Sequence, residues 1–181
     1  VHLLRFEKSY LVMNNYSWLQ RQLHEIVLSP AFMRELAFDL ESLFFPKVSK
    51  SVGDHVFISG LARSGTTTLL NAIFSTNEFA SLTYADMPFV LAPNLWSKIS
   101  NHRRHIDFTE RAHGDGIMVS SASPEAFEEV FWQTFHADEV ATRRKFEIFV
   151  GAIMVRYKRK RYLSKNNQNY QRLKLISEIY P

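Results

Sequence analysis

The segment from Val56 to Thr68 constrains the fold of this chain more than any other. It reads Val-Phe-Ile-Ser-Gly-Leu-Ala-Arg-Ser-Gly-Thr-Thr-Thr, which predicts a short apolar strand, a loop bounded by Gly60 and Gly65, and a helix that begins at the threonines. Glycine lets the backbone approach an anion closely, and the start of a helix presents N–H groups and a positive partial charge. This order of elements therefore predicts a phosphate-binding loop.

The loop departs from that of nucleotide triphosphatases at one position. The separation of Gly60 and Gly65 fits the Walker A pattern, but the lysine which that pattern places next, to reach the β- and γ-phosphates, is replaced by Thr66. The cation of this loop is Arg63, which lies inside it. We therefore expect a site for a phosphate ester and not one for ATP or GTP hydrolysis.

Length and composition predict one globular domain, residues 1–181. Of the 181 residues, 46% are hydrophobic and 14% aromatic, which is enough for a core rich in aromatic side chains. The absence of cysteine excludes disulfides and thiol catalysis and favours a reducing, cytoplasmic location. No apolar run approaches the length of a transmembrane segment. A net charge of +4 suits an anionic ligand and is too small to indicate nucleic acid.

We divide the chain into a helical lead-in, 1–46, and an α/β core, 50–181. In the lead-in, apolar residues recur at helical spacing as far as Ser29–Pro30, and a further helix is expected over 31–44. In the core we expect strands over 55–59, 79–84 and 161–164, helices over 66–75, 124–136, 139–157 and 168–179, a broken helix or lid over 87–99, and a loop over 101–119.

These elements predict an α/β fold with few strands and a parallel sheet. A right-handed crossover makes the second expected strand parallel to the first. Three strands alone leave a sheet edge exposed, and Tyr180–Pro181 stands where the last helix should lead into another strand. We therefore expect that the C-terminal part of the fold follows Pro181.

The loop resembles the 5′-phosphosulfate-binding loop of sulfotransferases. Those enzymes carry a Lys- or Arg-Ser-Gly-Thr-Thr core directly after the first strand, and residues 63–67 match its arginine form, found in Golgi-type and many bacterial members. Residues 162–167 are similar to a strand end of the same family, where a lysine lies near the sulfuryl group. Residues 123–132 resemble a segment of bacterial members.

The resemblance implies the sulfotransferase variant of the P-loop-type, three-layer α/β/α fold, and a specific reaction. The sulfuryl group of 3′-phosphoadenosine 5′-phosphosulfate (PAPS) would pass in line to an acceptor hydroxyl or amine, without a metal, because backbone amides can stabilise the phosphate that leaves. Arg63 and Lys165 would share the developing charge. The donor site would consist of Arg63, Ser64, Gly65, Thr66, Thr67 and Thr68. The Arg and Ser that hold the donor's 3′-phosphate in this family would follow Pro181.

Three residues are candidates for the general base, which must lie within hydrogen-bond reach of the acceptor. Asp86 follows the second expected strand, where some family members place a glutamate, and it can equally cap a helix. His113 and Asp115 lie in a glycine-containing stretch, and other members use a histidine from a loop; they can also be solvated. We expect Glu125 and Glu128 to serve the helix dipole and the surface.

Two other functions stay open on the sequence. A P-loop kinase-like phosphotransferase uses the same kind of loop, although the missing lysine and the lack of a carboxylate pair for Mg²⁺ argue against it. A non-catalytic nucleotide- or anion-binding module needs only the loop. The acceptor of a sulfotransferase can be a small molecule, a carbohydrate, a lipid or a peptide. The basic run 156–161 can steer such anions or touch acidic lipid, but we favour a solvated helix end.

Overall fold

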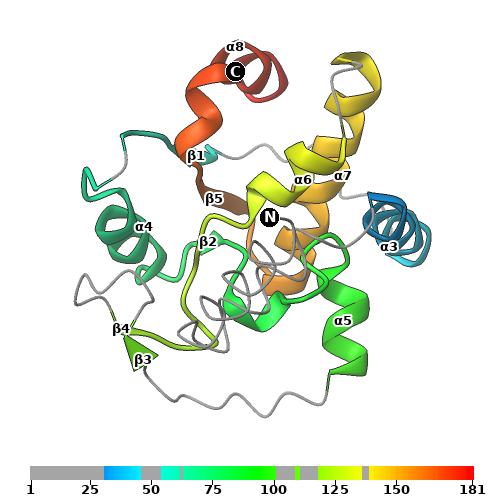
Figure 1. Ribbon diagram of the computed structural model, residues 1–181, viewed down its shortest axis with the longest axis horizontal. Helices are drawn as coiled ribbons and strands as arrows, with labels where there is room; N and C mark the ends of the chain where they lie inside the picture. Colours follow the sequence, from blue (N-terminus) through cyan, green and yellow to red (C-terminus); the bar gives the residue numbers. More distant parts are fainter. Residues whose placement is uncertain (1–30, 46–53, 62, 101–108, 111–117, 136–138) are drawn as a thin grey trace, which may run out of the picture.

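The computed structural model describes residues 31–45, 54–61, 63–100, 109–110, 118–135 and 139–181. At its centre, β1 (Val56–Ile58), β5 (Arg161–Lys165) and β2 (Phe79–Ala80) form a parallel sheet in the order β1–β5–β2 (Figure 1). β5 pairs with both other strands, with Leu163 opposite Val56 and Arg161 opposite Phe79. Because the strands are parallel, Ile58, Ala80 and Lys165 end them on the same side, which we call the carboxyl end of the sheet.

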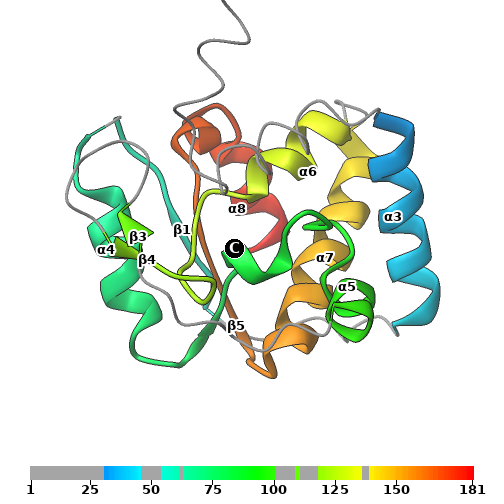
Figure 2. The same ribbon diagram turned by 60° about the horizontal axis from the view of Figure 1, so that its bottom comes forward.

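Helices cover both faces of this sheet, because side chains of a strand alternate between its faces. Phe57 and Tyr162 point toward the larger core, which contains α7 (Glu139–Tyr157). Ile58, Phe79 and Leu163 pack instead with Leu70 of α4 (Thr66–Phe74) in a smaller core. Figure 2 shows α4 on one side of β1 and β5 and α7 on the other. The predicted α/β class with a parallel sheet is confirmed.

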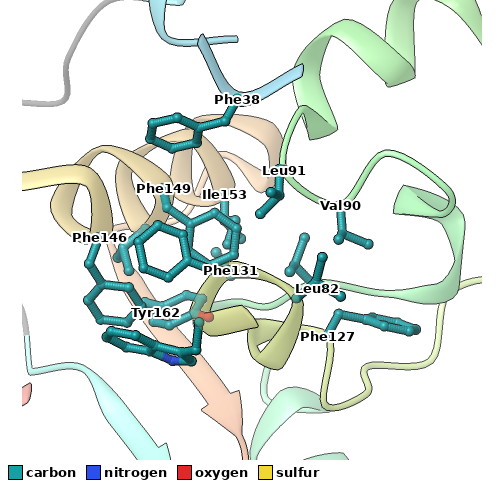
Figure 3. Close-up of a cluster of buried hydrophobic side chains, with 14 of the residues drawn as sticks. Phe38, Leu82, Val90, Leu91, Phe127, Phe131, Phe146, Phe149, Ile153 and Tyr162 are labelled. Atoms are coloured by element: carbon teal, nitrogen blue, oxygen red, sulfur yellow. The ribbon is translucent and has the colours of Figure 1, made fainter. Parts of the chain in front are cut away.

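The larger core is built mainly from aromatic rings (Figure 3). Phe131 of α6 (Glu128–Thr134) lies at its centre, fully buried, with its ring 5.0 Å from that of Phe149 and 5.2 Å from that of Phe146. Phe38 of α3 (Ala31–Phe44) closes it from the outside and contacts Phe135 at 4.8 Å. Burial of so many rings is the main source of stability available to this fold.

A buried carboxylate fastens α3 to α5 (Pro93–Ile99). Glu41 of α3 is only 1% exposed and accepts hydrogen bonds from the backbone N–H groups of Asn94 and Leu95, each at 3.0 Å. The Asn94 side-chain amide donates to the same carboxylate at 2.6 Å. A negative charge here satisfies the N–H groups at the start of α5 and complements its dipole.

Several element boundaries agree with the sequence predictions. α3 and α7 span the predicted ranges, β1 lies within 55–59, and α4 ends one residue before the predicted end at 75. The final helical segment is divided into a 3-10 helix, η2 (Asn167–Gln171), and α8 (Leu173–Ile179). The predicted helices before Ala31 lie outside the described residues. The expectation of further strands after Pro181 stays a prediction.

Three element predictions were wrong. The second strand ends at Ala80 and not at 84, because Tyr84–Asp86 forms a 3-10 helix, η1. The helix predicted from 124 begins only at Glu128, because Pro124 forms an antiparallel bridge with Thr83. The predicted loop 101–119 contains two short strands that pair antiparallel, β3 (Thr109–Glu110) and β4 (Met118–Val119). None of the described helices is both long and apolar enough to span a membrane.

Candidate functional site

The loop between β1 and α4 has a left-handed backbone at two residues. Gly65 has φ 80° and stands at the N-cap of α4, where glycine adopts this conformation without a steric penalty. Arg63 has φ 64°, a conformation that costs a residue with a Cβ about 1–2 kcal/mol. Strain of this kind is retained mostly where the local geometry serves a function. Arg63, Ser64 and Gly65 are exposed.

The loop folds back closely on itself at Gly60. A Cβ at this position would lie 3.0 Å from both Ser64 Oγ and Thr66 Cγ2, so a larger residue would have to displace these two side chains. The Ser64 backbone N–H and hydroxyl both donate to the Leu61 carbonyl, at 3.2 and 2.7 Å. These contacts fix the turn that leads into α4.

The start of α4 favours an anion. Its first turn, Thr66–Thr68, contains no acidic side chain. The N-cap residue, Gly65, has no side chain that could accept a hydrogen bond from the first N–H groups of the helix. The positive end of the helix dipole is therefore not offset by a local carboxylate. Of the three threonines, Thr67 is buried, Thr66 is half-buried and Thr68 is exposed.

Lys165 lies next to this loop at the carboxyl end of the sheet. It is opposite Ile58 in the pairing of β5 with β1, and the following residue, Asn166, donates its N–H to the Ile58 carbonyl at 2.9 Å. Lys165 is two residues after Leu163 in β5, so the two side chains leave the sheet on the same face, which α4 covers. Strand pairing therefore places Lys165 beside the strand that leads into the loop containing Arg63.

Glu125 forms an ion pair with Lys165, which the sequence prediction missed. Its Oε1 lies 3.5 Å from the Lys165 Nζ, and the two side chains are 12% and 11% exposed. The Ala126 N–H donates to the same oxygen at 3.0 Å, and the Tyr84 hydroxyl donates to Oε2 at 3.5 Å. Glu125 reaches this place because its own N–H donates to the Leu82 carbonyl beyond β2. Its predicted place at the surface was wrong.

Asp86 is held inside the fold by Thr83, Tyr157 and Arg156. It is 0% exposed, and its Oδ2 accepts hydrogen bonds from the Thr83 N–H at 2.9 Å and the Tyr157 hydroxyl at 2.5 Å. Its Oδ1 lies 3.5 Å from the Arg156 Nε. Burial raises the pKa of Asp86, and burial beside this carboxylate raises the pKa of Tyr157. The arrangement gives Asp86 a structural role and does not support its prediction as the general base.

Glu128 is also buried, contrary to the predicted surface position. It is 1% exposed and accepts hydrogen bonds from Trp132 Nε1 at 2.9 Å, Asn169 Nδ2 at 3.0 Å and the Tyr162 hydroxyl at 3.0 Å. Burial, followed by the charge of Glu128, raises the pKa of Tyr162. The carboxylate thus links α6, β5 and η2 beneath the site.

The remaining candidates have separate outcomes. His113 and Asp115 lie outside the described residues. In the basic run, Arg156 contacts buried Asp86, Arg161 donates to the Asp54 carbonyl at 2.9 Å and pairs with Glu78 at 3.0 Å, and residues 158–160 are exposed. Only residues 158–160, which follow the end of α7, are therefore solvated as predicted. Within the described part of the chain, no group of three or more His, Asp or Glu side chains is placed to hold a metal ion.

Three comparisons with known proteins found no match. No family model matches the sequence, and the searches of curated proteins and of solved structures found no significant match. Function is therefore inferred from the residues at the carboxyl end of the sheet.

Proposed function

We propose that this chain binds the 5′-phosphosulfate of PAPS at the loop 60–68 and transfers the sulfuryl group to an acceptor hydroxyl or amine. We also propose that the chain has the sulfotransferase variant of the P-loop fold. The observation that carries it is the combination of a strained loop at the start of α4, with Arg63 at φ 64°, and Lys165 opposite the last residue of β1.

The loop has the properties that a phosphate ester requires. The start of α4 offers backbone N–H groups and a positive partial charge, with no acidic side chain in its first turn. Arg63 is exposed beside it and can make paired hydrogen bonds to phosphate and sulfuryl oxygens. These groups stabilise negative charge that is already present on the donor and that moves onto its phosphate as the sulfur–oxygen bond breaks.

Lys165 supplies the second positive charge, on the next strand. Its side chain leaves the sheet on the α4 face, so a sulfuryl group held at the loop would lie between Arg63 and Lys165. An ammonium group is a compact charge suited to an oxygen whose charge grows during the reaction. Thr66 in place of the Walker A lysine favours this reaction over transfer of a terminal phosphate.

The first test is ligand binding measured by calorimetry. We expect 3′-phosphoadenosine 5′-phosphate (PAP), the product of the donor, to bind more tightly than ATP–Mg²⁺. We expect Arg63→Ala to weaken PAP binding by about tenfold or more, because a charge-assisted hydrogen bond contributes about 1.5–3 kcal/mol. Sulfuryl transfer should be nearly abolished while the thermal midpoint is not lowered.

Arg159→Ala is the matched control, since Arg159 is an exposed arginine beyond the opposite end of β5. It should leave PAP binding unchanged. Tighter binding of ATP–Mg²⁺ than of PAP would replace the proposal with a phosphotransferase. Unchanged transfer by Arg63→Ala would contradict the assignment of the loop, and PAP binding without transfer to any acceptor would indicate a binding module.

A further inference from the structure

The carboxylates near the carboxyl end of the sheet differ in how they are held. Asp86 and Glu128 are 0% and 1% exposed and engaged inside the fold. Glu129 is held by both guanidinium nitrogens of Arg172, at 2.9 and 3.1 Å, and by the Asn166 side-chain amide at 2.6 Å. Glu125 accepts a hydrogen bond from the Ala126 N–H at 3.0 Å and contacts Lys165 Nζ and the Tyr84 hydroxyl at 3.5 Å each. Glu125 is thus the carboxylate of this group that pairs with the cation at the end of β5.

The order of the strands places Glu125 across from the loop. Along the carboxyl end of the sheet, the loop follows β1, Lys165 ends β5, and Glu125 is hydrogen-bonded to Leu82 just beyond β2. Lys165 therefore lies between the predicted phosphate site and the carboxylate, and it contacts the carboxylate directly. A sulfuryl group held at the loop and at Lys165 would have its free side toward Glu125.

We infer that Glu125 is the general base of the proposed sulfuryl transfer and takes the proton from the acceptor hydroxyl. The inference rests on the proposed function and assigns to Glu125 the role that the sequence offered to Asp86, His113 or Asp115.

The two carboxylate oxygens have different surroundings, which fits this role. Oε1 accepts from the Ala126 N–H and faces Lys165, whereas Oε2 faces the Tyr84 hydroxyl. The oxygen of the acceptor forms a bond to sulfur as its proton passes to the carboxylate. The bond between sulfur and the bridging oxygen breaks, and its electron pair stays on the phosphate of PAP, beside Arg63 and Lys165. The carboxylate is neutralised in this step, which frees the Lys165 charge for the leaving phosphate.

The test uses water as the acceptor, so that it does not depend on the natural acceptor. PAP release from PAPS is measured for the whole chain and for Glu125→Gln, which keeps the shape of the side chain but cannot take the proton. We expect a loss of about 10²-fold or more in turnover, with the affinity for PAP not reduced. Glu125→Ala should lose turnover equally and regain part of it when sodium formate supplies a carboxylate.

Glu78→Gln is the matched control, because Glu78 pairs with Arg161 at 3.0 Å at the opposite end of β5. It should retain full turnover. Two outcomes would overturn the inference while the unaltered chain still binds PAP and consumes PAPS: full turnover by Glu125→Gln, or a turnover loss in Glu125→Ala that formate does not restore. An unaltered chain that does not bind PAP, or that binds PAP without consuming PAPS, would contradict the proposed function itself.

Discussion

The aromatic core beside α7 and the carboxyl end of the sheet are built from opposite kinds of residue. In the core, Phe131 and Phe146 are 0% exposed and contact several other rings. At the carboxyl end of the sheet, the loop residues Arg63, Ser64 and Gly65 are exposed, and two of them have a left-handed backbone. The core gains free energy from burial, whereas the loop spends conformational free energy to present a charge.

If the proposed function holds, stability and ligand binding depend on separate residues in this chain. Strands β1 and β5 connect the two regions, because Phe57 and Tyr162 point into the core while Lys165 ends β5 beside the loop. Substitutions in the core should therefore change unfolding without changing the affinity for PAP, and substitutions in the loop should do the reverse.

Phe131→Ala should produce the largest loss of stability. It removes the central ring of the core and leaves a cavity among Phe38, Phe146 and Phe149, which should lower the free energy of unfolding by about 3–5 kcal/mol. Chemical denaturation measures this change. Phe32→Ala is the control, because Phe32 is 67% exposed on α3. A loss no larger than that of the control would contradict the central role of this ring.

Glu128→Gln should have an intermediate effect, because Glu128 lies where the core meets the strand that ends in Lys165. Replacing one carboxylate oxygen with an amide removes an acceptor from Trp132, Asn169 or Tyr162, and a buried group without its partner costs about 1–3 kcal/mol. Glu147→Gln, at an exposed position of α7, is the control. Lower affinity for PAP in the folded Glu128→Gln variant would show that the two regions are coupled.

Asp86→Asn should have the smallest effect at neutral pH, and its effect should depend on pH. Burial raises the pKa of Asp86 above the ordinary value of 3.8, so the folded state binds the proton more tightly than the unfolded state. The resulting stabilisation is complete below 3.8 and is lost as the pH rises through the higher pKa of the folded state.

Asp86→Asn lacks this titration, so its stability relative to the unaltered chain should increase as the pH rises from about 4 to 7. Denaturation curves across that range measure the difference. The variant should also retain turnover, because the Asp86 carboxylate is 0% exposed. A large loss of turnover with unchanged stability would restore Asp86 as the candidate base.

The sequence predicted the elements whose signals are local. The bounds of α3 follow from apolar spacing and from the prolines that flank it, and the loop at Gly60 and Gly65 follows from strand, glycine and helix signals that are adjacent in the chain. The position of Lys165 beside this loop follows from parallel pairing of two apolar strands. These features depend on neighbouring residues or on a single sheet.

The sequence did not predict features that depend on distant partners. Ser123–Pro124–Glu125 has the composition of a helix start, but pairing of Pro124 with Thr83 holds the segment extended and delays α6 to Glu128. The burial of Asp86 and Glu128 also depends on distant residues, Tyr157 in one case and Tyr162 in the other. A charged residue needs a partner if it is buried, but the sequence does not show which element supplies that partner.

The left-handed backbone at Arg63 has a consequence for protein engineering. Glycine at this position would relieve about 1 kcal/mol of steric strain, so a selection for thermal stability alone would favour Arg63→Gly. The selected protein would unfold at a higher temperature and would have lost the guanidinium group of the loop. A thermostable form of this protein should therefore be sought with position 63 held fixed, because under the proposed function stability and activity oppose each other at this residue.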